Sequence, residues 1–175
     1  MENSSMVKIG PVGNANYGNM WDEKGRTEIV QIFVSHDTKI HSLQFLYAND
    51  DGELVLSDKH GRSTAGDNFN VESLNYPSEY ITSVSGKYDN ISGIKSITFG
   101  TNLGTHGPFG ETSEDDKGFM LHLGSKRQFG GFHGTADSWL RSIGIYVKLI
   151  STLASLKEKE VPKLHCLKKD DINIM

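Results

Sequence analysis

The chain has 175 residues and a formal net charge of −4, from 18 Lys and Arg against 22 Asp and Glu, which is enough chain for one domain with a buried core. This mildly acidic balance argues against a general nucleic-acid-binding protein, which carries an excess of basic residues. No run of about 18 apolar residues is present, so neither a transmembrane helix nor a membrane partner is expected. The one cysteine, Cys166, excludes an internal disulfide and a cysteine-cluster zinc site.

Short strands joined by tight turns are predicted for residues 1–150. Runs rich in β-branched and aromatic residues predict strands over 28–34, 53–56, 80–84 and 119–123. Turn-forming residues separate these runs, and all 19 glycines precede residue 151. No helical pattern is found before residue 148, so the pattern favours an all-β sandwich, barrel or prism.

Three six-residue segments share one pattern: apolar, basic, serine, apolar, any residue, apolar. They are residues 40–45 (IHSLQF), 94–99 (IKSITF) and 140–145 (LRSIGI). Each follows a lead-in with strand character, at 31–35, 81–85 and 131–133. Such spacing predicts one supersecondary unit used three times around a common core. Strict alternation along a strand would put positions 1, 3 and 5 on one face and positions 2, 4 and 6 on the other.

The last part of the chain has a different composition from the rest. Residues 151–175 contain five Lys, four acidic residues and no glycine. Leu149, Leu153 and Leu156 have the spacing of a short amphipathic helix over about 148–160, which Pro162 would end. We therefore divide the chain into an N-terminal extension (1–5), a β domain (6–148) and a C-terminal tail (149–175) that is either helical or disordered. The first residues lack the basic and apolar segments of a secretory signal, which predicts a cytoplasmic or nucleocytoplasmic protein.

Four motifs in a fixed order carry a resemblance to a known family. They are residues 7–13 (VKIGPVG) with Trp21-Asp22, 74–81 (LNYPSEYI), 97–102 (ITFGTN) with 107–110 (GPFG), and 130–134 (GGFHG) with 142–147 (SIGIYV). With these motifs the chain resembles the plant jacalin-related lectins over about residues 6–148, and its single-chain form is similar to the mannose-type branch. The resemblance implies an all-β fold, a β-prism of three four-stranded Greek-key sheets with pseudo-three-fold symmetry, which agrees with the repeat.

The resemblance also implies a sugar site at one end of the prism, formed by the loops 13–18, 88–93 and 137–141. In the family, glycines let the backbone approach the sugar, an Asp carboxylate accepts hydrogen bonds from adjacent hydroxyls, and an aromatic ring often packs on the sugar. Neither a metal nor any other cofactor is needed. Carried over to this chain, the carbohydrate-binding residues are Gly18, Tyr17, Tyr88, Asp137, Ser138, Trp139 and Arg141.

The sequence departs from the family pattern at this site. Tyr17 and Asp137 take positions that the family keeps as glycine, and Arg141 takes the position of the acidic ligand. Arginine has five donors and no acceptor, so Arg141 cannot replace a carboxylate. A shift in loop register would let Asp137 serve instead, with the backbone N–H groups of Ser138 and Trp139, and Arg141 would then face an acidic or phosphorylated ligand. Trp139 would either cover the end of the prism or stack on a ligand.

Two functional hypotheses follow. In the first, the chain is a lectin with a degenerate sugar site that binds mannose-type or acidic glycans in plant defence. In the second, it is a protein-interaction module without sugar binding. The second is implied by a smaller group of jacalin-type proteins that restrict the movement or replication of RNA viruses, which residues 55–61, 74–77 and 128–135 resemble; its partner would be a viral or host protein. Homo-oligomers are expected in both cases.

Other residue types that carry chemistry do not form a known motif. His60, His106 and His133 each precede a glycine, and their spacing fits no local metal motif. Ser142 is not part of a Gly-x-Ser-x-Gly elbow, and Gly18 is not followed by the Lys-Ser/Thr of a phosphate loop. We therefore predict a binding protein that is not an enzyme and has no metal site.

Overall fold

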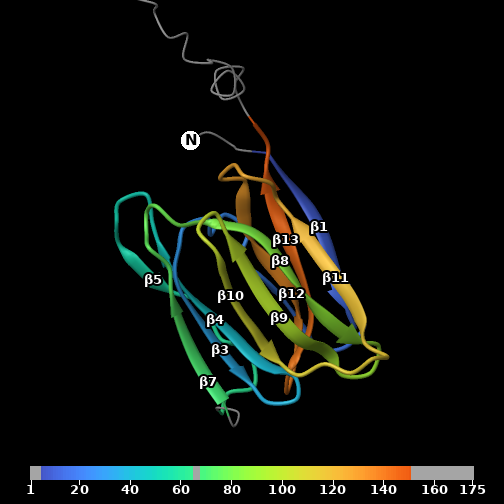
Figure 1. Cartoon of the computed structure of the whole chain (residues 1–175). Coiled ribbons are helices and arrows are strands. Elements are labelled where there is room, and N and C mark those ends of the chain that lie inside the picture. The colour runs from blue at the N-terminus through green and yellow to red at the C-terminus, as the bar shows by residue number, and fades with distance from the viewer. Residues whose placement is uncertain (1–4, 65–67, 151–175) are drawn as a thin grey trace, which may run out of the picture.

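The computed structural model describes residues 5–64 and 68–150, and within them it forms strands, turns and loops without a helix. The strands make three antiparallel sheets (Figure 1). In spatial order, the first sheet contains β1 (Met6–Gly13), β13 (Leu140–Lys148), β12 (Phe129–Ala136) and β2 (Asn19–Asp22). The second contains β10 (Thr105–Gly110), β9 (Gly93–Thr101), β8 (Ile81–Asp89) and β11 (Lys117–His122). The third contains β5 (Leu54–Leu56), β4 (Ile40–Ala48), β3 (Ile29–His36) and β7 (Asn68–Ser73), with β6 (His60–Gly61) also paired to β4.

Each sheet is built on a hairpin whose two strands lie in the middle: β3–β4, β8–β9 and β12–β13. In the third sheet, β5 and β6 follow one another along the same edge of β4, so this sheet also has four strand positions. Ser57 lies between them, and its Oγ accepts a hydrogen bond from the backbone N–H of Phe45 at 3.0 Å, which continues the edge across the break. The predicted β-prism of three four-stranded sheets is confirmed.

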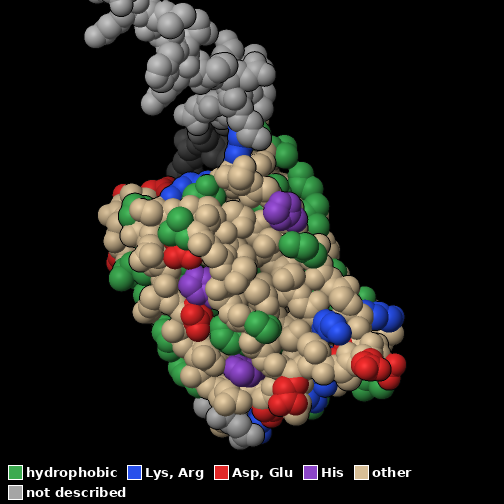
Figure 2. Space-filling view, viewed as in Figure 1, with side chains coloured by type: hydrophobic (Ala, Val, Ile, Leu, Met, Phe, Trp, Pro, Cys, Tyr) green, Lys and Arg blue, Asp and Glu red, His purple; other side chains and the backbone are tan. Residues whose placement is uncertain are grey.

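The three sheets meet on an aromatic core. Phe45, Phe99 and Phe132 come from β4, β9 and β12, and all three are fully buried. Their ring centroids lie 5.0 to 6.4 Å apart, so each ring contacts the other two. Burying one such side chain contributes about 1.5–3 kcal/mol. On the face shown in Figure 2, hydrophobic side chains form small separate groups, whereas the buried ones form a cluster to which all three sheets contribute.

A β-bulge near the start of β4, β9 and β13 changes the alternation expected for the repeat. His41, Lys95 and Arg141, the second residue of each six-residue segment, are skipped in the pairing with the neighbouring hairpin strand. The bulge turns the first position to the same side as the fourth and sixth. Positions 1, 4 and 6 are therefore the buried core residues in all three segments: Ile40, Leu43, Phe45, Ile94, Ile97, Phe99, Leu140, Ile143 and Ile145. The expectation that position 1 shares a face with positions 3 and 5 was wrong.

The other predicted elements correspond to strands whose ends differ by a few residues. The runs 28–34, 53–56, 80–84 and 119–123 fall on β3, β5, β8 and β11. The lead-ins to the repeat fall on β3, β8 and β12. The helix expected over about 148–160 lies almost wholly outside the described residues. Leu149 and Ile150 are the only described residues that follow β13. No helix that could span a membrane occurs in the described ranges.

A half-buried imidazole links two sheets through carboxylates. His106 on β10 has Nδ1 at 3.1 Å from Glu72 Oε2 on β7 and Nε2 at 2.9 Å from Glu79 Oε1. Burial by itself lowers the pKa of His106, but the two carboxylates outweigh it and the pKa is raised. Burial raises the pKa of Glu79, but hydrogen bonds from the Asn75 N–H, His106 and Thr101 outweigh it and the pKa is lowered.

This triad makes the unfolding free energy depend on pH. A raised histidine pKa stabilises the fold below pH 6.5, and this contribution is lost as pH rises through the folded-state pKa. A lowered glutamate pKa stabilises the fold above pH 4.5, and this is lost as pH falls through its folded-state value. We expect His106→Gln to lower the unfolding free energy by about 1–3 kcal/mol, most strongly between pH 4.5 and 6.5. Urea unfolding across this range measures it. His122→Gln, on an exposed site of β11, is the control, and an equal loss at every pH would contradict the charged triad.

Candidate functional site

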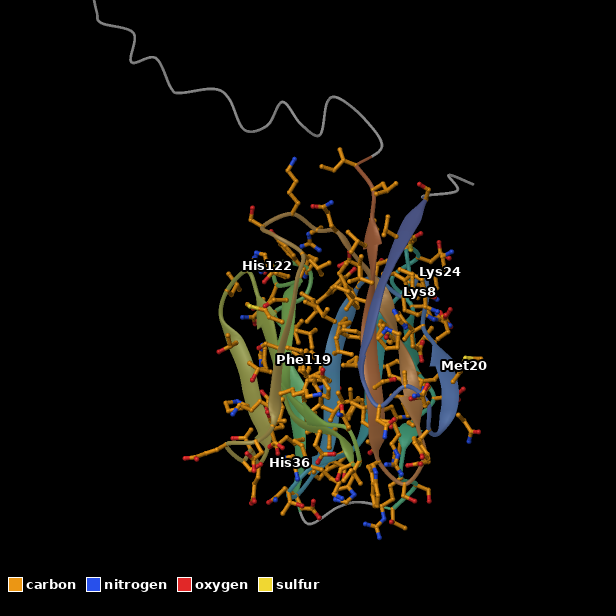
Figure 3. The ribbon with its side chains drawn as sticks, turned by 90° about the vertical axis from the view of Figure 1, so that its right-hand side faces the viewer. Lys8, Met20, Lys24, His36, Phe119 and His122 are labelled. Carbon is orange, nitrogen blue, oxygen red and sulfur yellow. The ribbon has the colours of Figure 1, made fainter. Side chains whose placement is uncertain are left out.

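One end of the prism gathers the turns of all three hairpins. These turns are residues 37–39, 90–92 and 137–139, and the loop 14–18 between β1 and β2 joins them there. In Figure 3 the labelled His36, which ends β3, marks this end, away from the two chain termini. The three loops that were expected to form a sugar site are therefore brought together.

Each hairpin turn is held by an aspartate. Asp37, Asp89 and Asp137 each accept a hydrogen bond from the backbone N–H two residues later, at 3.2, 2.7 and 3.3 Å. This is the Asx turn, in which a short carboxylate side chain stands in for a backbone acceptor. All three turns thus have the same local construction, as the repeat would require.

In two of the three repeats, the bulge residue carries a positive or protonatable group in contact with the aspartate of its turn. Arg141 Nε lies 2.9 Å from both carboxylate oxygens of Asp137. His41 Nε2 lies 2.8 Å from Asp37 Oδ2. Burial raises the pKa of Asp37, but its hydrogen bonds and the His41 imidazole outweigh this and the pKa is lowered. The carboxylates of Asp37 and Asp137 are therefore paired inside the protein.

A pocket of about 360 Å³ opens between the loop 14–18 and two of the turns. Its lining residues are Asn14, Tyr17, Asn90, Ile91, Ser92, Trp139 and Arg141. Asn14 fixes one wall, because its N–H donates to Arg141 O at 2.8 Å and its Nδ2 donates to Asn90 O at 2.6 Å. Gly13 has a φ of +105°, and a Cβ there would come within 2.5 Å of Arg141 O, so only glycine lets the chain enter the loop this close to the bulge.

Arg141 spans the base of this pocket. Its side chain is 14% exposed; beside the Nε contacts with Asp137, Nη1 donates to Ile91 O at 2.8 Å. These hydrogen bonds involve Nε and Nη1 of Arg141 but not Nη2. The guanidinium therefore ties the third hairpin turn to the second, and it supplies donors where a carboxylate would supply acceptors.

Two aromatic side chains flank the guanidinium. Tyr17 is 61% exposed, and its ring centroid lies 5.9 Å from the Arg141 guanidinium carbon. Trp139 is half-buried, with Lys39 Nζ 3.9 Å and the Arg141 guanidinium 4.9 Å from its ring centroid. Two cations lie close to the half-buried tryptophan ring, whereas the tyrosine ring has one cation near it and is mostly exposed, so it is the ring with more surface for stacking.

The predicted site residues fall into three groups. Tyr17, Trp139 and Arg141 line the pocket. Gly18 lies against the end of β12, since a Cβ there would come within 2.8 Å of the Ala136 backbone. Asp137 supports Arg141, and Ser138 is exposed on the turn.

Tyr88 lies away from the pocket lining. It pairs with Ile94 in the β8–β9 ladder, and its ring lies 6.3 Å from that of Phe119 beside the core. The second repeat supplies the pocket with residues 90–92 instead. These residues, and Asn14, were not singled out from the sequence, although all of them lie within or beside the expected loops. The described residues contain no group of three or more His, Cys, Asp or Glu that could hold a metal ion.

Comparison with known proteins gives the same answer from sequence and from structure. The model of the jacalin-like lectin domain matches residues 9–146. Two Arabidopsis thaliana proteins, Inactive protein RESTRICTED TEV MOVEMENT 1 and Protein RESTRICTED TEV MOVEMENT 1, are 45% and 44% identical over 153 residues, which cover 81% of this chain and 87% of each relative. The crystal structure of single-chain recombinant jacalin superposes with a TM-score of 0.73 at 33% identity, over 85% of this chain and 98% of that one. The chain therefore belongs to the jacalin-like lectin domain family, and its three sheets are those of the jacalin β-prism.

Proposed function

We propose that this chain is a carbohydrate-binding lectin of altered specificity, acting in plant defence in the cytoplasm or nucleocytoplasm, whose pocket at the hairpin end takes a glycan with an acidic group. One observation carries the proposal: Arg141 presents a guanidinium at the base of the pocket, and the neighbouring carboxylate of Asp137 is already paired with it. The family resemblance implies that related lectins have a sugar-binding Asp at the position where this chain has Arg141.

The donor–acceptor balance of the pocket favours an acidic sugar over a neutral one. Two adjacent hydroxyls of mannose would need an acceptor for their protons, and Arg141 has none. A carboxylate or sulfate on the glycan would accept from Arg141 Nη2 and gain a charge-assisted hydrogen bond. Asn14 and Ser92 offer neutral polar groups beside it, and the exposed Tyr17 ring offers a face for the sugar.

The proposal is one of binding without turnover. The side chains that line the pocket are amide, hydroxyl, phenol, indole, aliphatic and guanidinium groups, with no imidazole or carboxylate at the lining to move a proton.

The proposal includes a homo-oligomer, in which copies of the chain associate through exposed apolar side chains. The outer face of the third sheet exposes Leu54, Leu56, Phe69 and Val71, and Met20 projects from β2 with 90% of its surface exposed (Figure 3).

A second candidate is a protein-interaction module that restricts the movement of an RNA virus and does not bind sugar. The internal Asp137–Arg141 pair supports it, because the pair removes the free carboxylate at this end. The identity of 44–45% to proteins named for restricted virus movement supports it as well. The same pocket would then receive an acidic side chain of a viral or host protein.

Restoring the family pattern should create mannose binding. The double variant Asp137→Gly, Arg141→Asp removes the internal ion pair and supplies a carboxylate, so we expect it to bind methyl α-mannoside at least about tenfold more tightly than the wild type. Titration calorimetry measures the change. Lys95→Asp, at the equivalent bulge of the second repeat, is the matched control, and a double variant that binds no better would contradict the role given to position 141.

Neutralising the guanidinium should remove binding of acidic glycans. Arg141→Gln keeps a polar side chain but loses the charge, so we expect about a tenfold or greater loss of signal for sulfated and uronic-acid glycans. A glycan array with wild type and variant side by side tests this. A wild-type protein that binds neither neutral nor acidic glycans would exclude the lectin proposal and leave the second candidate.

The second candidate is tested in plant cells with a fluorescent reporter of RNA virus movement. If the chain is a protein-interaction module, it should reduce spread whether or not its glycan array is blank, and Arg141→Gln should weaken this restriction. Deleting residues 151–175 separates a role of the β domain from one that needs the tail. Unrestricted movement in cells that express the intact chain would exclude this candidate.

A further inference from the structure

A second pocket lies at the other end of the prism. It measures about 220 Å³ and lies between the β2–β3 connection and the β4–β5 turn. Its lining residues are Gly25, Arg26, Thr27, Tyr47, Ala48, Asn49, Asp50 and Asp51. β4 begins at the hairpin end and has nine residues, so its far end lies about 26 Å from that site. The two pockets have no lining residue in common.

Tyr47, one of the residues that line this pocket, has a buried hydroxyl without a partner. Tyr47 is 1% exposed, and its hydroxyl has no hydrogen-bond partner among the described residues. Burial raises the pKa of Tyr47 well above its usual range, with Glu23 raising it further and Arg26 lowering it. An unpartnered buried hydroxyl costs the fold free energy, and a ligand group that reached it would recover part of that cost.

The two charged neighbours of Tyr47 differ in how firmly their own contacts hold them. Glu23 Oε1 lies 2.7 Å from His60 Nε2, and the His60 ring stacks on Trp21 with centroids 4.1 Å apart. Glu23 is therefore a fixed carboxylate that does not bond directly to the Tyr47 hydroxyl. Arg26 Nη1 reaches Asn49 Oδ1 at only 3.5 Å, at the limit of a hydrogen bond, which leaves its guanidinium able to serve a ligand.

We propose that this second pocket binds a neutral polyhydroxylated ligand, such as one pyranose or cyclitol unit. A hydroxyl can accept from Tyr47 or Arg26 and donate to a carboxylate at the same time. An ammonium group could not accept from Tyr47, and an anion would be repelled by Asp50 and Asp51 at the rim. The site is separate from that of the proposed function and does not depend on it.

The test is a titration of the isotope-labelled full chain followed by backbone amide chemical shifts. The probes are methyl α-glucopyranoside and myo-inositol, with inorganic phosphate and methylammonium as charged comparisons. We expect the neutral polyols to shift the amides of residues 25–27 and 48–51, and the charged probes to leave them unchanged. Shifts by the charged probes alone, or no shift at the highest soluble polyol concentration, would overturn the proposal.

Tyr47→Phe is the decisive variant, because it removes only the hydroxyl. We expect polyol binding at this pocket to weaken about tenfold, and the thermal midpoint without probe to stay equal or rise, since an unpartnered buried hydroxyl is lost. The matched control is Tyr146→Phe, whose hydroxyl donates to Asp22, so there the midpoint should fall. A midpoint that falls in Tyr47→Phe, or polyol binding that is unchanged in it, would contradict the proposal.

The outcome also separates the two ends of the prism. Arg141→Gln should leave the polyol shifts at 25–27 and 48–51 unchanged. Shifts confined to the region of Tyr17 and Trp139 would overturn the second site and leave the proposed function intact. Shifts at the second site together with no binding on the acidic glycan array would support the second site and overturn the proposed binding of acidic glycans.

Discussion

The β-bulge at the second position of each repeat is the constraint on which the fold and the site both depend. It sends Ile40, Ile94 and Leu140 into the core beside the fourth and sixth positions, so three residues of every segment pack against the other sheets. It also takes one residue out of the ladder at the hairpin end. The residue at this position, which is His41, Lys95 or Arg141 in the three repeats, has no partner in the strand pairing. Its side chain is therefore less constrained by the neighbouring strand.

The choice of side chain at the bulge sets the chemistry of the hairpin end. The Arg141 guanidinium pairs with the Asx-turn carboxylate of Asp137. Its Nη1 also donates to Ile91 O, which joins the third hairpin turn to the second. The same end therefore gains rigidity and loses its free acceptor. At the far end, Glu23 is held by His60, and the nearby Tyr47 hydroxyl has no hydrogen-bond partner in the described chain. One prism thus presents two polar pockets with different demands on a ligand.

Much of the fold was predictable because strands, turns and repeats are local in sequence. The runs of β-branched residues gave β3, β5, β8 and β11, and the three six-residue segments marked the central strands of the sheets. The face assignment failed, since a bulge has no signature in a binary apolar pattern: position 1 is apolar whichever way it points. The break between β5 and β6 was not predicted either, because it depends on how Ser57 contacts the neighbouring strand: its backbone N–H donates to Phe45 O at 2.8 Å, but the acceptor for the Phe45 N–H is the side-chain Oγ of Ser57.

The sequence by itself determined the residue types at the site: the loops that meet, and an arginine where the family resemblance implies an acid. Only the tertiary structure decided what those residues do. Asp137 could be read as a free acceptor until its carboxylate was seen 2.9 Å from Arg141 Nε. Tyr88 could be read as part of the pocket until strand pairing placed it beside the core, with residues 90–92 at the pocket instead. The reason is physical: residue type limits the bonds a group can make, whereas packing of distant segments selects which of those bonds form.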